Sequence, residues 1–188
     1  MRPHGRQWLV TGVFALAIVC QPAPLTAQRV SSADVKAAFL FNFTKFATWP
    51  ATRLPAGQPI IVGVIGDNAV AESVRRLVGN KIVEGRSVTV TRLRPTDDFS
   101  QTHLLFIGNG ERQHLVDILI RAGRDAVLTV SDVPDFCARG GMIQLRNERD
   151  RVRFDIALDR AEAAGVIISS RVLAIAGVIN PASSVRFR

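Results

Sequence analysis

The stretch QPIIVGVIGDNAVAESVRRLVGN, residues 58–80, decides the fold class. It opens with an uninterrupted apolar run at residues 60–65, which is typical of a strand buried on both faces of a parallel sheet. Gly66 and Asp67 then supply a turn and a helix N-cap, and residues 68–78 predict a helix that Gly79 closes. A buried strand followed at once by a helix indicates an α/β protein.

The same alternation continues on both sides of this stretch. A first helix is expected to begin at a Ser31 or Ser32 N-cap and to end before Pro50, because the residue before a proline disfavours helical geometry. Its apolar positions follow helical spacing: Val35, Phe39, Phe43 and Phe46. Further along we expect a helix at residues 111–122 and strands at residues 87–93, 104–107 and 126–130.

The last third of the chain has a different pattern. Residues 142–145 and 152–156 flank the polar stretch 147–150 and predict an antiparallel hairpin added to the sheet. Residues 158–178 are expected to be helical in two pieces, broken near Gly165. The sequence therefore predicts a single α/β domain whose mixed, mostly parallel sheet carries helices on both faces and a C-terminal antiparallel hairpin.

The beginning of the chain has the features of a cleaved secretory signal peptide, residues 1–27. Arg2 and Arg6 precede a 13-residue apolar run, and small and turn-forming residues follow it. That run is short, since a membrane-spanning helix needs ~20 apolar residues. A lipoprotein signal acylated at Cys20 and a retained anchor are the alternatives. Cleavage leaves residues 28–188 as one domain in the periplasm.

Cysteine and charge say less about function. The mature chain keeps a single cysteine, Cys137, so it contains no internal disulfide. An intermolecular bond and a buried thiol are both open for this residue. The formal net charge is +8. We expect this positive charge to attract an acidic protein surface or anionic lipid. We do not expect nucleic acid as a partner, because an exported protein rarely meets it.

No motif with catalytic or metal-binding spacing stands out. Gly63 and Gly66 form neither a dinucleotide fingerprint nor a Walker loop, and no Cys or His pair has zinc-ligand spacing. Ser169 and Ser170 are not in a nucleophile elbow. We therefore predict no catalytic residue, no metal and no cofactor.

Two groups of residues are candidates for binding. One is an aromatic-rich part of the first helix that can widen its apolar surface into a partner-docking patch, with the protein core as the alternative place for it. The other is a ligand pocket at the carboxyl ends of the parallel strands. The partner-binding candidates are Leu40, Phe41 and Trp49, and the ligand-pocket candidates are Gly66, Gly108, Ser131 and Asp132.

Several of these segments, taken in chain order, resemble the YfiR family of periplasmic regulators. None is specific alone, but the ordered set covers essentially the whole mature chain. The segments are VKAAFLFNFTKF (35–46) with Trp49-Pro50, Gly85-Arg86, LLFI (104–107), VLTVSD (127–132), GGMI (140–143), RVRFDI (151–156), Ala164-Gly165 and ISSRVL (168–173).

This resemblance implies a non-enzymatic α/β protein that regulates an inner-membrane sensor. The best understood member of the family binds the periplasmic domain of a membrane-bound diguanylate cyclase and represses it, which lowers cyclic-di-GMP signalling and with it biofilm formation. The resemblance also implies a homodimer, and it leaves a histidine kinase as the alternative partner. Members often carry disulfides, and here Cys137 has no partner in the mature chain.

Two other functions compete with this inhibitory adaptor. A periplasmic sensor of a small ligand would use the pocket at the strand ends. An envelope hydrolase would need a serine, a histidine and an acid brought together in a polar pocket. A shallow apolar patch around the first helix would instead favour the adaptor.

Overall fold

The computed structural model describes residues 31–148 and 151–179. The expected signal peptide, residues 1–27, lies outside these ranges. The helices are α1 (Ser32–Phe46), α2 (Asn68–Val78), the short 3-10 turn η1 (Asn109–Glu111), α3 (Leu115–Ala122), α4 (Leu158–Ala163) and α5 (Ser170–Leu173). The strands are β1 (Ala47–Thr48), β2 (Ile60–Ile65), β3 (Ile82–Val83), β4 (Arg86–Leu93), β5 (Leu104–Ile107), β6 (Leu128–Ser131), β7 (Ile143–Glu148), β8 (Arg151–Ala157), β9 (Ile167–Ile168) and β10 (Gly177–Ile179).

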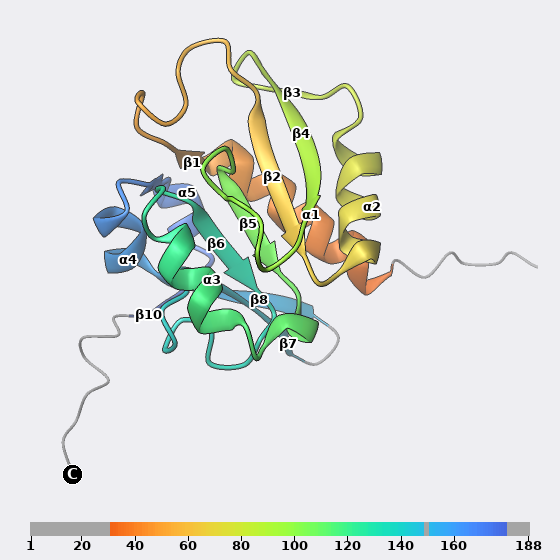
Figure 1. Ribbon diagram of the computed structural model, residues 1–188, viewed down its shortest axis with the longest axis vertical. Helices are drawn as coiled ribbons and strands as arrows, with labels where there is room; N and C mark the ends of the chain where they lie inside the picture. Colours follow the sequence, from red (N-terminus) through yellow and green to blue (C-terminus); the bar gives the residue numbers. More distant parts are fainter. Residues whose placement is uncertain (1–30, 149–150, 180–188) are drawn as a thin grey trace, which may run out of the picture.

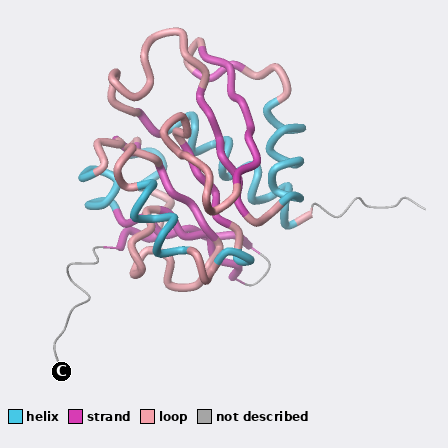
Figure 2. Tube along the Cα trace, viewed as in Figure 1, coloured by secondary structure: helices cyan, strands magenta, loops and turns pink. Residues whose placement is uncertain are grey.

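One eight-stranded sheet forms the centre of the molecule, in the order β10-β8-β7-β6-β5-β2-β4-β3 (Figures 1 and 2). Strands β4, β2, β5, β6 and β7 run parallel to one another, whereas β3 pairs antiparallel with β4 and β8 pairs antiparallel with β7. The mixed, mostly parallel sheet confirms the predicted fold class.

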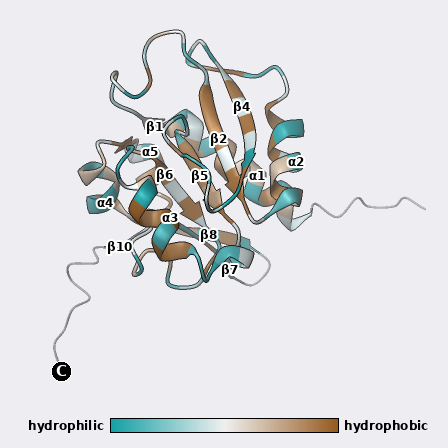
Figure 3. Cartoon of the chain, viewed as in Figure 1, coloured by the Kyte–Doolittle hydropathy of each residue, from teal (hydrophilic) through white to brown (hydrophobic). Residues whose placement is uncertain are grey.

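Helices cover both faces of this sheet. Figure 1 shows α3 in front of the strands and α1 behind them, with α2 beside α1. Alternate residues of each central strand therefore enter different cores: Leu104 and Phe106 of β5 join the cluster under α1 and α2, and Leu105 and Ile107 join the one under α3. Burial on both faces explains the continuous apolar runs in the sequence, which Figure 3 shows as brown strands.

Local signals placed most of the central elements correctly. The predicted strands 60–65 and 104–107 and the predicted helix 68–78 match β2, β5 and α2. The Ser31 hydroxyl caps α1 by accepting from the amide of Asp34 at 3.1 Å. The predicted helix at 111–122 is shorter, because the exposed polar residues 112–114 add nothing to the apolar face that begins at Leu115.

The predicted two helical pieces, broken near Gly165, are confirmed by α4 and α5, but the second piece is much shorter than residues 166–178. Gly165 has φ +76° and ends the helical stretch soon after α4. The β-branched pair Ile167–Ile168 then forms β9, which pairs with β1 in a second, two-stranded sheet. Strand β10 adds parallel to β8, so the hairpin β7–β8 is not the last part of the main sheet. Tertiary pairing has overridden local helix propensity here.

Within residues 31–148 and 151–179, no helix is both long and apolar enough to cross a membrane.

Candidate functional site

A partly buried ion cluster occupies the carboxyl ends of the parallel strands. Lys36 of α1 places its Nζ atom 2.6 Å from Oδ2 of Asp132, which follows β6, and 3.6 Å from Oδ2 of Asp67, which follows β2. The Lys36 side chain is only 14% exposed. Its ammonium group also lies 5.8 Å from the centre of the Phe106 ring. One cation thus joins α1 to two strand ends, because parallel strands bring their carboxyl ends to one edge.

Both carboxylates in this cluster have few hydrogen-bond or ion-pair partners besides Lys36. Asp67 accepts from the amide of Val70 through its other oxygen and caps α2. The Oδ1 atom of Asp132 is buried and has no hydrogen-bond partner in the described part of the chain. A buried carboxylate needs a counter-charge or donors to offset its desolvation. Lys36 is therefore the main compensation for Asp132.

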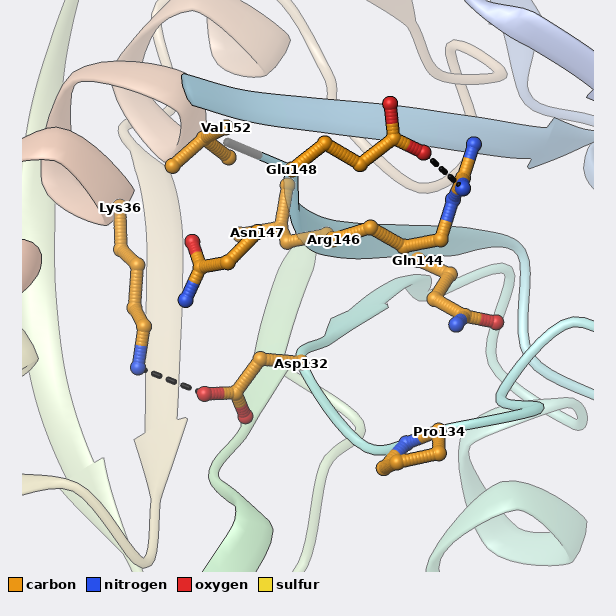
Figure 4. A pocket seen from close by; sticks show the side chains of 9 residues that line it. Lys36, Asp132, Pro134, Gln144, Arg146, Asn147, Glu148 and Val152 are labelled. Carbon is orange, nitrogen blue, oxygen red and sulfur yellow. Dashed lines mark hydrogen bonds and ion pairs between the residues drawn. The ribbon is translucent and has the colours of Figure 1, made fainter. Parts of the chain in front are cut away.

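A pocket of about 340 Å³ opens beside this cluster (Figure 4). In Figure 4, Lys36 points toward Asp132 across the space, and Arg146 and Glu148 form an ion pair along its other side. Arg146 also binds the buried carboxylate of Asp155: its Nη2 donates to Oδ1 at 2.9 Å, and this hydrogen bond is the largest cause that raises the pKa of the guanidinium. The lining residues are Lys36, Asp132, Pro134, Gln144, Leu145, Arg146, Asn147, Glu148 and Val152.

Of the four residues predicted to form a ligand pocket, the structure places only Asp132 in the lining of this one. Gly66 and Gly108 instead let two strand-to-helix connections approach each other: a Cβ on Gly108 would lie 2.9 Å from the carbonyl carbon and oxygen of Gly66. Gly66 also has φ +72°, which favours glycine. The buried Ser131 hydroxyl donates to the Ile107 carbonyl at 2.6 Å and accepts from Val133. These three residues have evident structural roles.

The groups that an envelope hydrolase would need are apart in the described residues. His103 is buried, its Nδ1 accepts from the amide of Ile61 at 3.0 Å, and its Nε2 therefore donates to the Arg53 carbonyl at 3.1 Å. Ser169 caps α5 by accepting from the amide of Arg171. No hydroxyl-to-imidazole hydrogen bond and no group of three potential metal ligands occurs in residues 31–148 or 151–179.

The predicted partner-binding residues separate into core and surface. Leu40 is fully buried, and Trp49 is 6% exposed with its Nε1 donating to the His103 carbonyl at 3.0 Å. Phe41 alone is partly exposed, so the three side chains do not make one accessible patch. The sequence alone does not separate the two groups, because α1 has more apolar residues than one buried face needs. Phe39 and Phe43 pack on Phe154, and Leu40 belongs to the same buried core.

Phe41 lies between two of the three lysines of the chain. The Nζ atoms of Lys45 and Lys81 lie 5.6 and 5.5 Å from the centre of its ring. Such cation–π contacts hold two charges over an aromatic face at the surface. The result is a small basic and aromatic surface, formed by Phe41, Lys45 and Lys81, that periodicity alone did not reveal.

Cys137 is buried, as one of the two open interpretations required. Its Sγ atom lies 3.6 Å from the Met142 carbonyl oxygen, and burial raises the thiol pKa to about 11. A protonated, inaccessible thiol is a poor nucleophile for disulfide exchange. An intermolecular bond through this residue is therefore not available to the folded chain.

Comparison with known proteins identifies the family of this chain. The model of the YfiR/HmsC-like family (DUF4154) matches residues 33–177. A crystal structure of a conserved domain protein from Vibrio cholerae O1 biovar eltor has the same fold, with a TM-score of 0.50 and 14% sequence identity over 79% of this chain. This chain spans 60% of that protein's length. No curated protein matches this sequence. The chain therefore belongs to the YfiR/HmsC-like family, a non-enzymatic family of periplasmic regulators of diguanylate cyclases.

Proposed function

We propose that this protein binds the periplasmic part of an inner-membrane diguanylate cyclase and holds the enzyme in its inactive state. The observation that carries this proposal is the family match, which begins in α1 and ends at the first residue of β10. It thus includes the whole domain and not a single motif. The regulatory output would be a lower level of cyclic-di-GMP in the cytoplasm.

Repression of this kind needs only a difference in affinity. A regulator that binds the inactive state of the cyclase more tightly than the active state shifts the population toward the inactive state. A shift from almost fully active to almost fully inactive requires a preference of about 10⁴-fold. No covalent chemistry at the regulator is needed.

Phe41 is the part of the predicted partner-binding segment that a partner can reach. We propose that the surface of Phe41, Lys45 and Lys81 contacts an acidic and apolar surface of the cyclase. Aromatic side chains at a surface are frequent anchors of binding energy, and the two lysines add attraction for acidic groups. Leu40 and Trp49 are buried in the core, so a partner does not touch them.

The cellular test starts from a strain that lacks the gene. We expect cyclic-di-GMP and biofilm to rise, and the wild-type gene to restore both. Phe41→Ala should restore them incompletely, whereas Val116→Ala, which removes an exposed apolar side chain from α3 on the opposite face, should restore them fully. Unchanged cyclic-di-GMP in the deletion strain contradicts a cyclase partner and directs the search to a histidine kinase.

A further inference from the structure

A second pocket lies at the opposite end of the parallel strands from the Lys36 cluster. Its volume is about 270 Å³, and its walls come from the loop before β2 and the loop before β5 (Figure 1). The polar residues of its lining are Thr52, Arg53, Gln58, Gln101 and His103. No acidic residue of the described chain lines it, and His103 is neutral, since its Nδ1 accepts a hydrogen bond. The one full charge in the lining is therefore positive.

The Arg53 guanidinium, which carries this charge, is held by backbone carbonyls and not by a carboxylate. Nη1 donates to the Ser100 carbonyl, and Nη2 donates to the Thr102 carbonyl at 2.9 Å. In residues 31–148 and 151–179, the arginines that form ion pairs are Arg75, Arg76, Arg92, Arg94 and Arg146. A guanidinium has five N–H groups, and the Nε atom of Arg53 is buried. One N–H on each Nη atom of this partly exposed residue thus remains for a ligand.

The charges that act on His103 are also positive. Burial is the largest cause that lowers the pKa of this imidazole, and the charges of Arg53 and Arg86 lower it further. The hydrogen bond to the Arg53 carbonyl is the opposing cause, and no carboxylate of the described residues contributes. The Arg86 guanidinium likewise donates to backbone carbonyls, those of Gln58 at 3.0 Å and Leu54 at 3.4 Å. Two cations without a paired carboxylate therefore lie close to this pocket.

Two acidic residues belong to neighbouring loops, and neither lines the pocket. Both carboxylate oxygens of Asp98 accept from Ser100, and Glu84 lines a separate cavity of about 60 Å³ together with Arg86. Within the described residues, neither acid forms an ion pair with Arg53 or Arg86. The positive lining therefore favours a ligand that brings negative charge.

We propose that this pocket binds the anionic group of a small molecule, either a carboxylate or a phosphate, through the remaining N–H groups of Arg53. Guanidinium groups are preferred partners of both anions, and this one is already held in position, which lowers the entropy cost of binding. Thr52 and Gln101 are exposed at the pocket and can add a hydroxyl and an amide donor. The inference is independent of the proposed function, because the site does not include the surface around Phe41.

Gln101 is exposed, so a substitution there tests the site without disturbing the core. Gln101→Glu places a carboxylate in the lining, where it repels an anion and can itself pair with Arg53. Gln113→Glu is the matched control, since it makes the same change of charge at an exposed residue outside the lining. Arg53→Lys is a second variant, which keeps the positive charge and loses the planar fork of donors.

Trp49 provides the readout for binding in ¹H–¹⁵N NMR spectra. Its indole Nε1 donates to the His103 carbonyl at 3.0 Å, and the centres of the two rings are 5.9 Å apart. It is the one tryptophan outside the predicted signal peptide, so its indole N–H signal is simple to assign. The probes are inorganic phosphate and acetate, added separately at one constant ionic strength.

We expect at least one probe to shift this signal saturably, with a Kd of about 10 mM or tighter, and the probe that does so identifies the class of anion. Gln101→Glu and Arg53→Lys should weaken this binding by about tenfold or more, and Gln113→Glu should stay within about twofold of wild type. Circular dichroism and thermal unfolding check that the variants are folded. No saturable shift with either probe up to about 50 mM, or equal affinity in Gln101→Glu and wild type, overturns the inference.

Discussion

Replacing Lys36 by methionine tests whether the ion cluster at the strand ends stabilises the fold as inferred. The change keeps the aliphatic stem and removes the charge that lies 2.6 Å from Asp132 and 3.6 Å from Asp67. Two carboxylates that are each less than a quarter exposed then lose their shared counter-ion. Removing one partner of a fully buried pair costs about 3–5 kcal/mol. Because water reaches both carboxylates here, we expect a loss of about 2 kcal/mol in the free energy of unfolding.

Urea unfolding measures this loss directly. With an m-value of about 2 kcal/mol per M, the midpoint should fall by about 1 M. Lys45→Met is the matched control on the same helix: Lys45 is exposed and contacts only aromatic faces among the described interactions, so it should lose about 0.5 kcal/mol or less. A double variant with Asp132→Asn should lose less than the sum of the two single losses. A Lys36→Met midpoint no lower than that of Lys45→Met refutes the reasoning.

Three further predictions concern buried groups elsewhere. Burial raises the pKa of the Cys137 thiol to about 11, so at pH 7.5 it should react with a maleimide more than about a hundredfold more slowly in the native state than in urea. Mass spectrometry follows the labelling, and rapid labelling of the native protein would contradict this prediction. Burial, together with Arg53 and Arg86 nearby, lowers the pKa of His103. The neutral imidazole therefore contributes to the free energy of unfolding in full above its unfolded pKa of about 6.5. That contribution is lost as the pH falls below this value through the folded pKa. Urea midpoints at pH 7.5 and 5.0 should therefore differ less in His103→Gln than in wild type, and an equal pH dependence would argue against it. Gly108→Ala should lower the free energy of unfolding by about 1–3 kcal/mol, because the new Cβ would lie 2.9 Å from the Gly66 backbone. Gly110→Ala is the control and should cost less, since its Cβ would lie 3.5 Å from the Gly66 carbonyl oxygen. Equal losses in thermal unfolding would contradict the close approach.

The central elements could be predicted because their burial leaves a local signature. A strand covered on both faces needs apolar residues at every position, as in Ile60–Ile65 and Leu104–Ile107, and the capping residues Ser31 and Asp67 act within one turn of their own chain. Neither signal depends on distant partners. The family resemblance rests on a longer ordered set of segments, which includes Leu104–Ile107, and was confirmed by the match over residues 33–177.

The remaining elements depend on contacts between distant parts of the chain. β9 exists because Ile168 pairs with Ala47, more than a hundred residues earlier, and β10 exists because β8 offers it an edge. Local propensity has no access to such pairings, so the residues of β9 and the start of β10 were predicted as helix, whereas α5 between them was predicted correctly.

The site shows the same limit. Asp132 was predicted from its place after a strand, but Lys36 was missed, since a single lysine in an aromatic helix gains its role only from the two carboxylates that the sheet brings to it. Helical spacing in α1 likewise could not decide which of its neighbouring apolar residues are covered. The structure divides them, with Leu40 inside and Phe41 between two lysines at the surface.

The most direct test of the central claim is isothermal titration of the purified protein into the periplasmic domain of an inner-membrane diguanylate cyclase from the same cell. We predict saturable binding, with an affinity that falls for Phe41→Ala and stays unchanged for Val116→Ala. A folded cyclase domain that shows no heat of binding with the wild-type protein, at any concentration up to about 100 µM and over a range of salt, would contradict regulation by direct contact.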